Sequence, residues 1–416
     1  MRLTLFSFSV LFIGCPPVDP EPGSGPPEPP TLAPREWVAE AELTSSEYSQ
    51  PLMGGDLSGD GIPNIIVGVG PVAGQRTVLA SPLTSPPSPL AWVSASPSGQ
   101  LPAAIAGDLN GDGADDLLLS DRRGGTVSAW FGPLAGELGE PDWRFVGSPA
   151  SFSGVSGVIR DLDGDGANDL LLSAPGDPEA ECSVAHHGTM LFRGPITAGI
   201  VGPGDAQTVF RTPAQLTDCD GWFVDVFDAN ADSTLDVLIG SRSGHAHLYF
   251  GPISDGSIER SSADVFLGDP GADTLFWYDG LGVEGGILFG YGQEEFVALG
   301  MAFVPGPVQA GALTPADSAS IWVTPTDAFS PLMLAAADLD GDGVVDAAVT
   351  PDSGSEVTVV VGPLEDRRVS VSARIPLSQG AGVLFAADVD GDGRNELVTG
   401  DALEGLQVWS VVQLEP

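Results

Sequence analysis

A nine-residue acidic pattern occurs six times in this chain of 416 residues and constrains its fold more than any other feature. Each copy has oxygen-bearing side chains at positions 1, 3, 5 and 9, usually has glycine at position 6, and runs directly into an apolar segment such as 117–119. The copies occupy residues 56–64, 108–116, 161–169, 228–236, 338–346 and 388–396, and are named acidic loops 1, 2, 3, 4, 6 and 7.

The spacing of these oxygens indicates calcium binding. Calcium takes 6–8 oxygen ligands at about 2.3–2.6 Å, and alternate side chains around a glycine-containing turn converge on one point, with the position-7 carbonyl as a further ligand. One Asp/Asn/Gly turn would be ordinary, but six at near-regular spacing are not. An EF-hand is excluded, because position 12 falls in an apolar segment, as at Leu119, instead of being glutamate.

We therefore expect about six structural Ca²⁺ ions, one in each acidic loop. The expected ligands, at positions 1, 3, 5, 7 and 9, are Asp56, Ser58, Asp60, Ile62 and Asn64; Asp108, Asn110, Asp112, Ala114 and Asp116; Asp161, Asp163, Asp165, Ala167 and Asp169; Asp228, Asn230, Asp232, Thr234 and Asp236; Asp338, Asp340, Asp342, Val344 and Asp346; and Asp388, Asp390, Asp392, Arg394 and Glu396.

Successive loops start 52, 53, 67, 110 and 50 residues apart, so the longest step hides one more unit. Residues 287–295 fit the register of a fifth loop and 296–300 that of its strand, but positions 1, 3 and 5 are Ile287, Phe289 and Tyr291. We expect this loop to bind no calcium.

Four short apolar segments recur in each unit; in the second unit they are 103–106, 117–120, 126–131 and 142–146. This predicts an all-β fold, a seven-bladed β-propeller of four-stranded antiparallel blades, with a linear solenoid as the alternative. The seventh unit shows only three segments, and residues 36–43 resemble the fourth strands at 90–93 and 320–323. We expect this N-terminal strand to close blade 7, which removes an exposed edge.

The units resemble the FG-GAP repeats of integrin α-subunit propellers and their bacterial relatives. The third unit carries the resemblance best: Phe152-Ser-Gly, the loop 161–169 and Ser-Ala-Pro175 follow the family's order of Phe-Gly, calcium loop and Gly-Ala-Pro. Most other units lack the Phe-Gly. The resemblance covers roughly residues 35–416 and implies a calcium-binding propeller, a fold that serves adhesion, recognition and accessory roles in enzymes.

Residues 1–14 predict a signal peptide, because Arg2 precedes an apolar run too short to span a bilayer. The run ends at Cys15 and resembles the bacterial lipoprotein cleavage box, which implies lipidation; plain secretion and a misassigned start are alternatives. Residues 15–34 then form a lipidated cysteine and a Pro/Gly/Glu-rich linker. We expect an exported lipoprotein at the outer membrane or cell surface, or a periplasmic or secreted protein, with the lipid as its only membrane contact.

The net charge is −42 and the chain has no lysine, which argues against nucleic acid as a partner. The sequence also lacks Gly-x-Ser-x-Gly, His-Glu-x-x-His and Cys-x-x-Cys, so we do not expect an enzyme. A monomeric binding or adhesion module for a surface protein or glycan is the favoured function. A carbohydrate-active enzyme, or an accessory subunit of one, is the alternative.

Two side-chain groups have both a functional and a structural interpretation. The histidines of units 3 and 4 could bind a transition metal or be ordinary polar residues. The aromatics of unit 5 could fill space left by a lost calcium ion or form a platform for sugar or protein, which the exposure of Trp277 would distinguish. The two groups are His186, His187, His245 and His247, and Phe276, Trp277, Tyr278, Phe289, Tyr291 and Phe296.

The rim opposite the acidic loops is the expected partner site. In an up-and-down blade it carries the connections from second to third strands and from blade to blade. The longest, 174–188, contains Cys182, and Cys219 lies in the connection from blade 3 to blade 4. With Cys15 lipidated and an oxidising compartment implied by export, we expect a Cys182–Cys219 disulfide. Integrin propellers, by resemblance, also bind on the rim away from their calcium loops.

Overall fold

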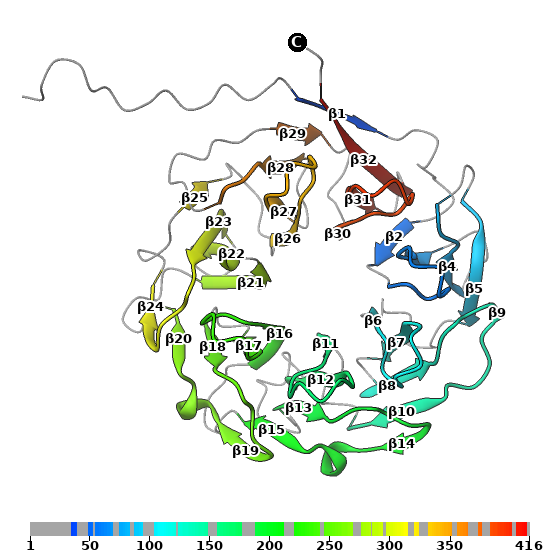
Figure 1. The fold of residues 1–416 in the computed structure, drawn as a ribbon, viewed down its shortest axis with the longest axis vertical. Coiled ribbons are helices and arrows are strands. Elements are labelled where there is room, and N and C mark those ends of the chain that lie inside the picture. Colours follow the sequence, from blue (N-terminus) through cyan, green and yellow to red (C-terminus); the bar gives the residue numbers. More distant parts are fainter. Residues whose placement is uncertain are drawn as a thin grey trace, which may run out of the picture.

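Seven β-sheets stand around a central axis like the blades of a fan (Figure 1). The computed structural model describes residues 35–39, 49–52, 55–69, 75–83, 87–94, 104–121, 124–148, 156–176, 188–211, 220–241, 245–268, 276–283, 285–293, 297–314, 320–323, 332–351, 356–364, 373–376, 383–401 and 405–413. The predicted seven-bladed, all-β architecture is confirmed. The only helices in these ranges are two short 3-10 turns, Pro203–Asp205 and Arg260–Ser262, and none is long or apolar enough to cross a membrane.

Within each blade, the strands lie in chain order from the central opening to the circumference, and β1 (Arg35–Ala39) is the outermost strand of blade 7 (Figure 1). In blades 1 to 3 the strands are β2 (Ser49–Leu52), β3 (Ile66–Val69), β4 (Gln75–Leu79) and β5 (Pro89–Ser94); β6 (Ala104–Gly107), β7 (Asp116–Asp121), β8 (Thr126–Trp130) and β10 (Trp143–Val146); and β11 (Gly157–Arg160), β12 (Asp169–Ala174), β13 (Gly188–Phe192) and β15 (Thr208–Arg211). In blades 4 to 7 they are β16 (Asp220–Phe227), β17 (Asp236–Ser241), β18 (Ala246–Tyr249) and β20 (Val265–Leu267); β21 (Phe276–Val283), β22 (Gly286–Gln293), β23 (Val297–Pro305) and β25 (Ser320–Val323); β26 (Leu332–Ala337), β27 (Asp346–Pro351), β28 (Glu356–Val360) and β29 (Ala373–Pro376); and β30 (Val383–Ala387), β31 (Glu396–Asp401) and β32 (Gly405–Gln413).

The central residues of the second strands are mostly apolar because both faces of these strands are buried. Successive side chains of a strand point to opposite faces. In β12, Leu170 and Leu172 pack into the core shared with blade 2, whereas Leu171 packs into the core shared with blade 4. The seven hydrophobic clusters of the described residues each bridge two neighbouring blades, so the core is a ring of interfaces.

The N-terminal strand closes blade 7, as predicted. Strand β1 (Arg35–Ala39) pairs antiparallel with β32, from Arg35 opposite Gln413 to Ala39 opposite Trp409. The strand starts one residue earlier than expected and its described part ends at Ala39, while 40–43 lie outside the described residues. The outer edge of β32 is therefore covered by the opposite end of the chain.

A fifth strand on four of the blades was not predicted. Short segments between the third and fourth strands of blades 2 to 5 reach back and pair in parallel with the outer strand of the preceding blade. These segments are β9 (Gly136–Glu137), β14 (Gly199–Val201), β19 (Gly256–Glu259) and β24 (Gly311–Leu313). Each covers an edge that a four-stranded blade would leave open, and each links two blades by backbone hydrogen bonds.

The expected fifth loop at 287–295 is wrong. Residues 286–293 form β22, the second strand of blade 5, and only residues 284–285 connect it to β21. The expected second strand at 296–300 is instead part of β23, the third strand. The apolar run decides the register, because Ile287, Leu288 and Phe289 are fully buried between blades 4, 5 and 6.

Removal of β1 tests the closure. We expect deletion of residues 1–43 to lower the midpoint of thermal unfolding by about 5 °C or more, because the outer backbone edge of β32 becomes exposed. Deletion of residues 1–34 alone is the matched control and should leave the midpoint unchanged. Equal midpoints for the two truncated proteins would show that β1 does not hold the ring closed.

Candidate metal centres

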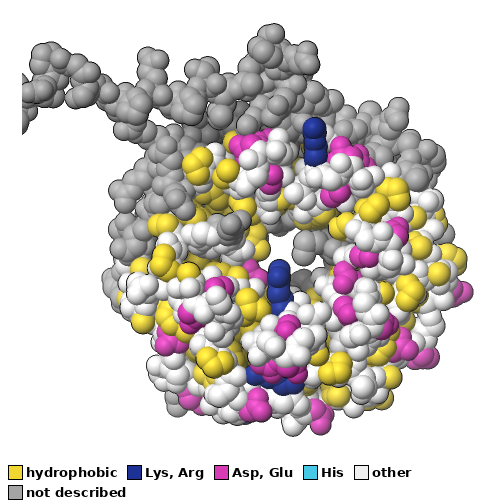
Figure 2. All heavy atoms as spheres, in the orientation of Figure 1, with side chains coloured by type: hydrophobic (Ala, Val, Ile, Leu, Met, Phe, Trp, Pro, Cys, Tyr) yellow, Lys and Arg dark blue, Asp and Glu magenta, His cyan; other side chains and the backbone are white. Residues whose placement is uncertain are grey.

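All six acidic loops connect a first strand to a second strand, so they lie on one rim of the ring. They leave β2, β6, β11, β16, β26 and β30. Acidic side chains recur around the ring in Figure 2, whereas basic side chains are few.

The position-1 carboxylate shapes each loop by accepting backbone hydrogen bonds. In acidic loop 3, Asp161 Oδ1 accepts from the N–H groups of Gly164 at 2.8 Å and Asp165 at 3.1 Å, and Oδ2 accepts from Gly166 at 2.9 Å. Gly164 and Gly166 have φ of +76° and +93°, a region that favours glycine. In acidic loop 4 the same two positions are Ala231 and Ser233, with φ of +61° and +69°, so this loop carries backbone strain.

The position-9 carboxylate lies buried at the start of the second strand and ties three segments together. Asp116 Oδ2 accepts from Leu109 N–H at 2.8 Å, within the loop, and Oδ1 accepts from Gly132 N–H at 2.7 Å, where the third strand ends in a Gly-Pro pair. Asp169, Asp236 and Asp346 accept the same two bonds. Glu396 accepts from Val389 N–H at 2.9 Å.

Burial makes these position-9 carboxylates expensive to ionise. Desolvation raises the pKa of Asp116 and Asp346 to about 6 and that of Glu396 to about 8, and the neighbouring loop carboxylates add to the rise. The pKa values of Asp169 and Asp236 are also raised, mainly by burial. A carboxyl group whose pKa is raised on folding contributes to stability at low pH, where it is protonated. That contribution is lost as the pH rises through the pKa of the folded state. Without a cation these groups therefore destabilise the fold near neutral pH.

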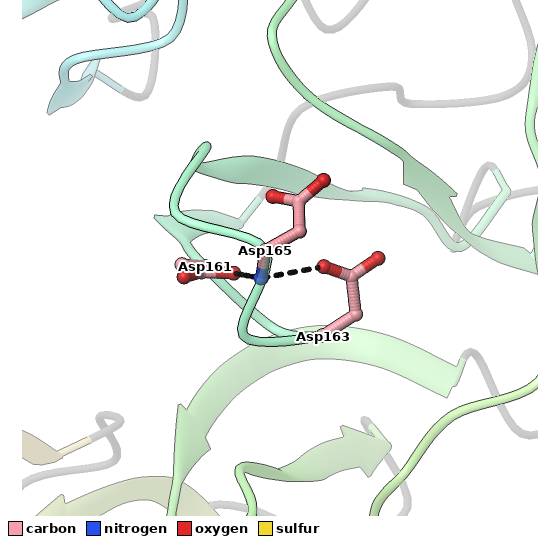
Figure 3. A group of neighbouring side chains, drawn as sticks. All are labelled: Asp161, Asp163 and Asp165. Atoms are coloured by element: carbon pink, nitrogen blue, oxygen red, sulfur yellow. Dashed lines mark hydrogen bonds between the residues drawn. The ribbon is translucent and has the colours of Figure 1, made fainter.

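Three loops bring carboxylates close enough to share one ion. In each group below, one carboxylate oxygen per residue lies within 4.8 Å of the others. Two oxygens on opposite sides of a calcium ion, each about 2.4 Å from it, are about 4.8 Å apart. Figure 3 shows the loop 3 group, in which Asp161 and Asp163 both accept hydrogen bonds from the backbone N–H of Asp165. The groups are Asp161, Asp163 and Asp165; Asp338, Asp340 and Asp346; and Asp388, Asp390 and Glu396.

The other three loops replace carboxylates with neutral oxygen donors. Acidic loop 1 has Ser58 and Asn64, and Asn64 Oδ1 accepts from Ser58 N–H at 3.0 Å. In acidic loops 2 and 4, Asn110 and Asn230 each donate to the position-5 carboxylate at 2.9 Å. All six loops thus present the hard oxygen donors that calcium prefers, but with different charge.

Arg193 is a site residue that sequence analysis missed. Its Nη1 lies 2.9 Å from Asp169 Oδ2 and 3.3 Å from Asp163 Oδ2, so a guanidinium already neutralises part of acidic loop 3. Its Nη2 donates to the carbonyl of Ile253 in blade 4 at 2.7 Å. The available signal was the arginine of Phe192-Arg-Gly-Pro195, which stands where units 2 and 4 have the phenylalanine of Phe-Gly-Pro.

The loops also join neighbouring blades. In acidic loops 1, 2, 4 and 7, the backbone carbonyl at position 2 accepts a hydrogen bond from the next blade, from the residue after the Pro that follows the third strand. Leu134 N–H donates to the Leu57 carbonyl at 2.7 Å, and Ile196 N–H donates to the Leu109 carbonyl at 2.9 Å. Position-8 side chains add a second link, since Asn168 donates to the carbonyl of Asp108 at 2.8 Å. A conformational change in one loop would therefore alter hydrogen bonds at a blade interface.

The remaining candidate residues are placed only in part. The ring centroids of His245 and His247 lie 5.2 and 5.4 Å, respectively, from the ring centroid of Phe266. His247 is buried on β18. Phe289 belongs to the core between blades 4 and 5. His186, His187, Cys15, Cys182 and Cys219 lie outside the described residues, as does the side chain of Trp277.

The strain in acidic loop 4 gives a stability prediction. We expect Ala231→Gly and Ser233→Gly each to stabilise the protein by about 0.5–1 kcal/mol, because relief of an unfavourable positive φ outweighs the larger unfolded-state entropy of glycine. Ala167→Gly at position 7 of acidic loop 3, where φ is not positive, should destabilise it. Urea denaturation in chelator measures all three, and a loss of stability in both loop 4 variants would contradict the prediction.

Arg193 gives a second prediction. We expect Arg193→Ala to lower the stability of the calcium-free protein by about 2 kcal/mol, because Asp169 loses a charged hydrogen-bond donor. The affinity of acidic loop 3 for the expected calcium ion should rise, since Asp163 and Asp169 no longer pair with Arg193. Thermal unfolding in chelator and calorimetric calcium titration measure the two effects. Arg144→Ala, which removes an exposed pair with Glu140, is the control.

Comparisons with known proteins bear on the fold alone. A scan against protein-family models gives no match, and neither does a search of curated protein sequences. The solved structure of BBS1N in complex with ARL6DN, soaked with lead, is 9% identical with a TM-score of 0.52, covering 91% of this chain and 98% of that chain. Raptor from Chaetomium thermophilum is 9% identical with a TM-score of 0.55, covering 91% of this chain, which spans only 29% of the Raptor chain. The chain is thus similar in fold to these structures.

Proposed function

We propose that this chain is an exported, calcium-stabilised β-propeller that acts as a binding module for a protein or glycan at the cell surface. The observation that carries the proposal is the repeated acidic loop, in which a buried carboxylate joins the loop, its own blade and the end of the third strand. A cation bound there stabilises several blade contacts at once.

The donor set supports calcium as that cation. The loops offer carboxylate, amide and hydroxyl oxygens, with no thiol among their side chains. A bound dication offsets both the burial of the position-9 carboxylates and their repulsion by the other loop acids. The residues that would hold it are those at positions 1, 3, 5 and 9 and the position-7 carbonyl. Calcium supplies charge and coordination here and takes part in no reaction.

The energetic effect is sizeable even for weak sites. Extracellular modules bind calcium with Kd of about 10⁻⁴–10⁻³ M, so at about 1 mM calcium each site adds roughly 0.4–1.4 kcal/mol. Six such sites together approach the net stability of a typical domain, about 5–15 kcal/mol.

The binding role is supported by the propeller fold and by the location of all six acidic loops on one rim. Calcium loops occupy one rim, so the opposite rim can present connections of variable length to a partner. The similar propeller BBS1N was solved in complex with ARL6DN, which is consistent with a protein partner. The signal-like residues 1–14 and Cys15 support export and a lipid anchor, followed by the tether 16–34.

Calcium dependence is tested by thermal unfolding with 1 mM calcium and with excess chelator. We expect chelator to lower the midpoint substantially, and calorimetry to count about six ions. Asp165→Asn should reproduce part of the loss, because the amide can still accept the bond from Ala167 N–H but the charge is gone. Glu137→Gln, an exposed acid outside the loops, is the matched control. An unchanged midpoint in chelator would overturn the calcium proposal.

The binding role is tested separately, with glycan arrays and surface proteins probed in calcium. Retention without turnover supports a binding module, whereas turnover of a glycan supports an enzyme. Alanine substitutions across 177–187 should weaken any partner held on the opposite rim. Unchanged affinity for every detected partner would exclude that rim as the site.

A further inference from the structure

The blade interfaces share one packing rule next to the acidic loops. At five interfaces, a buried aliphatic side chain at loop position 2 packs in the same cluster as the aliphatic residue after the proline that ends the next blade's third strand. The pairs are Leu57 with Leu134, Leu109 with Ile196, Leu162 with Ile253, Ala229 with Val308, and Val389 with Leu83.

Of the two remaining interfaces, the one between blades 6 and 7 keeps a position-2 side chain, Leu339, whereas the one between blades 5 and 6 does not. Blade 6 supplies its residue, Leu364 after Pro363, but blade 5 has the two-residue connection 284–285 where the other blades have an acidic loop. Among the described residues, blade 5 therefore has no position-2 side chain beside Leu364. Leu364 lies in the same cluster as Met301 and Phe303 of the third strand of blade 5.

A cavity of about 340 Å³ opens at this place. Gly285 and Phe303 line it from blade 5, and Val344, Val345, Pro363 and Leu364 line it from blade 6. Val344, at position 7 of acidic loop 6, is 37% exposed, one of three large hydrophobic side chains in the described residues with such exposure. The cavity volume is at the lower end of the roughly 300–1,000 Å³ typical of ligand sites.

We infer that this cavity binds an aliphatic side chain of leucine size, presented by a segment of a partner protein. The side chains that line it are apolar, so a charged side chain would find no charged partner among them. The ring itself shows the fitting occupant, because the equivalent place at five other interfaces holds a Leu, Val or Ala side chain carried on a loop. The inference rests on the proposed binding role only in taking a protein as the natural occupant.

A neutral model compound tests the cavity independently of calcium chemistry and of the opposite rim. The probe is N-acetyl-leucine methylamide, titrated into methyl-labelled full-length protein in saturating calcium and followed by NMR. We expect saturable shifts confined to the methyl groups of Val344, Val345 and Leu364, while those of Leu134 and Ile196, at filled interfaces, stay fixed. N-acetyl-asparagine methylamide, similar in size but polar, should cause no such shifts.

Matched variants separate the cavity from general effects. Val344→Arg should weaken probe binding at least tenfold, because a guanidinium occupies the mouth; arginine is already present at the same loop position as Arg394. Val146→Arg makes the same change at an exposed position of β10, outside the acidic loops, and should alter binding less than twofold. Val345→Ala, which removes part of the wall, gives a second, milder variant and should weaken binding measurably. Absent shifts, equal shifts with the asparagine probe, or unchanged affinity in Val344→Arg would each overturn the inference.

Discussion

A buried carboxylate at the first residue of the second strand is the interaction on which most of this ring depends. In blades 2, 3, 4 and 6 it accepts one N–H from its own loop and one from the glycine that ends the third strand. The loop so fixed then accepts hydrogen bonds from the next blade. The same group is costly as an anion, since burial and neighbouring acids raise its pKa. The same carboxylate therefore orders the loop through its hydrogen bonds and destabilises the fold when it is ionised. A bound cation would offset that electrostatic destabilisation.

The six acidic loops are not equivalent, although their sequences repeat. Acidic loop 3 carries its own cation in Arg193, acidic loop 4 bends through non-glycine residues, and acidic loop 1 has only two carboxylates among its expected ligands. Ligand charge and rigidity both tune calcium affinity. If the loops bind calcium as proposed, they should fill over a range of calcium concentrations, and the stiffness of the ring would then change gradually with the ion instead of at one threshold.

Much of this fold could be predicted from sequence because its strongest signals are local. Loop spacing gives the blade count, and the apolar segment 117–120 identifies a strand buried on both faces. The fifth strands could not be predicted, since a segment as short as Gly136–Glu137 has no pattern of its own and is ordered by the neighbouring edge. Blade 5 was misregistered because 287–295 was matched to loop spacing, whereas the burial of Ile287 and Phe289 determines the structure. Arg193 pairs with Asp163 and Asp169, which are at least 24 positions away in the sequence, so the spacing of the loop residues does not predict this contact.

Closure by β1 has a consequence for how the chain reaches its final form. The first strand of the ring pairs with residues almost 380 positions later, between Arg35 and Gln413. Contacts so distant in sequence form slowly, because a long loop must close before they contribute. Until residues 405–413 are available, the edge that β1 will cover does not exist and β1 has no partner. If the protein crosses a membrane N-terminus first, β1 emerges before every other strand of the ring but is the last strand to pair. Blade 7 is then the final blade to assemble.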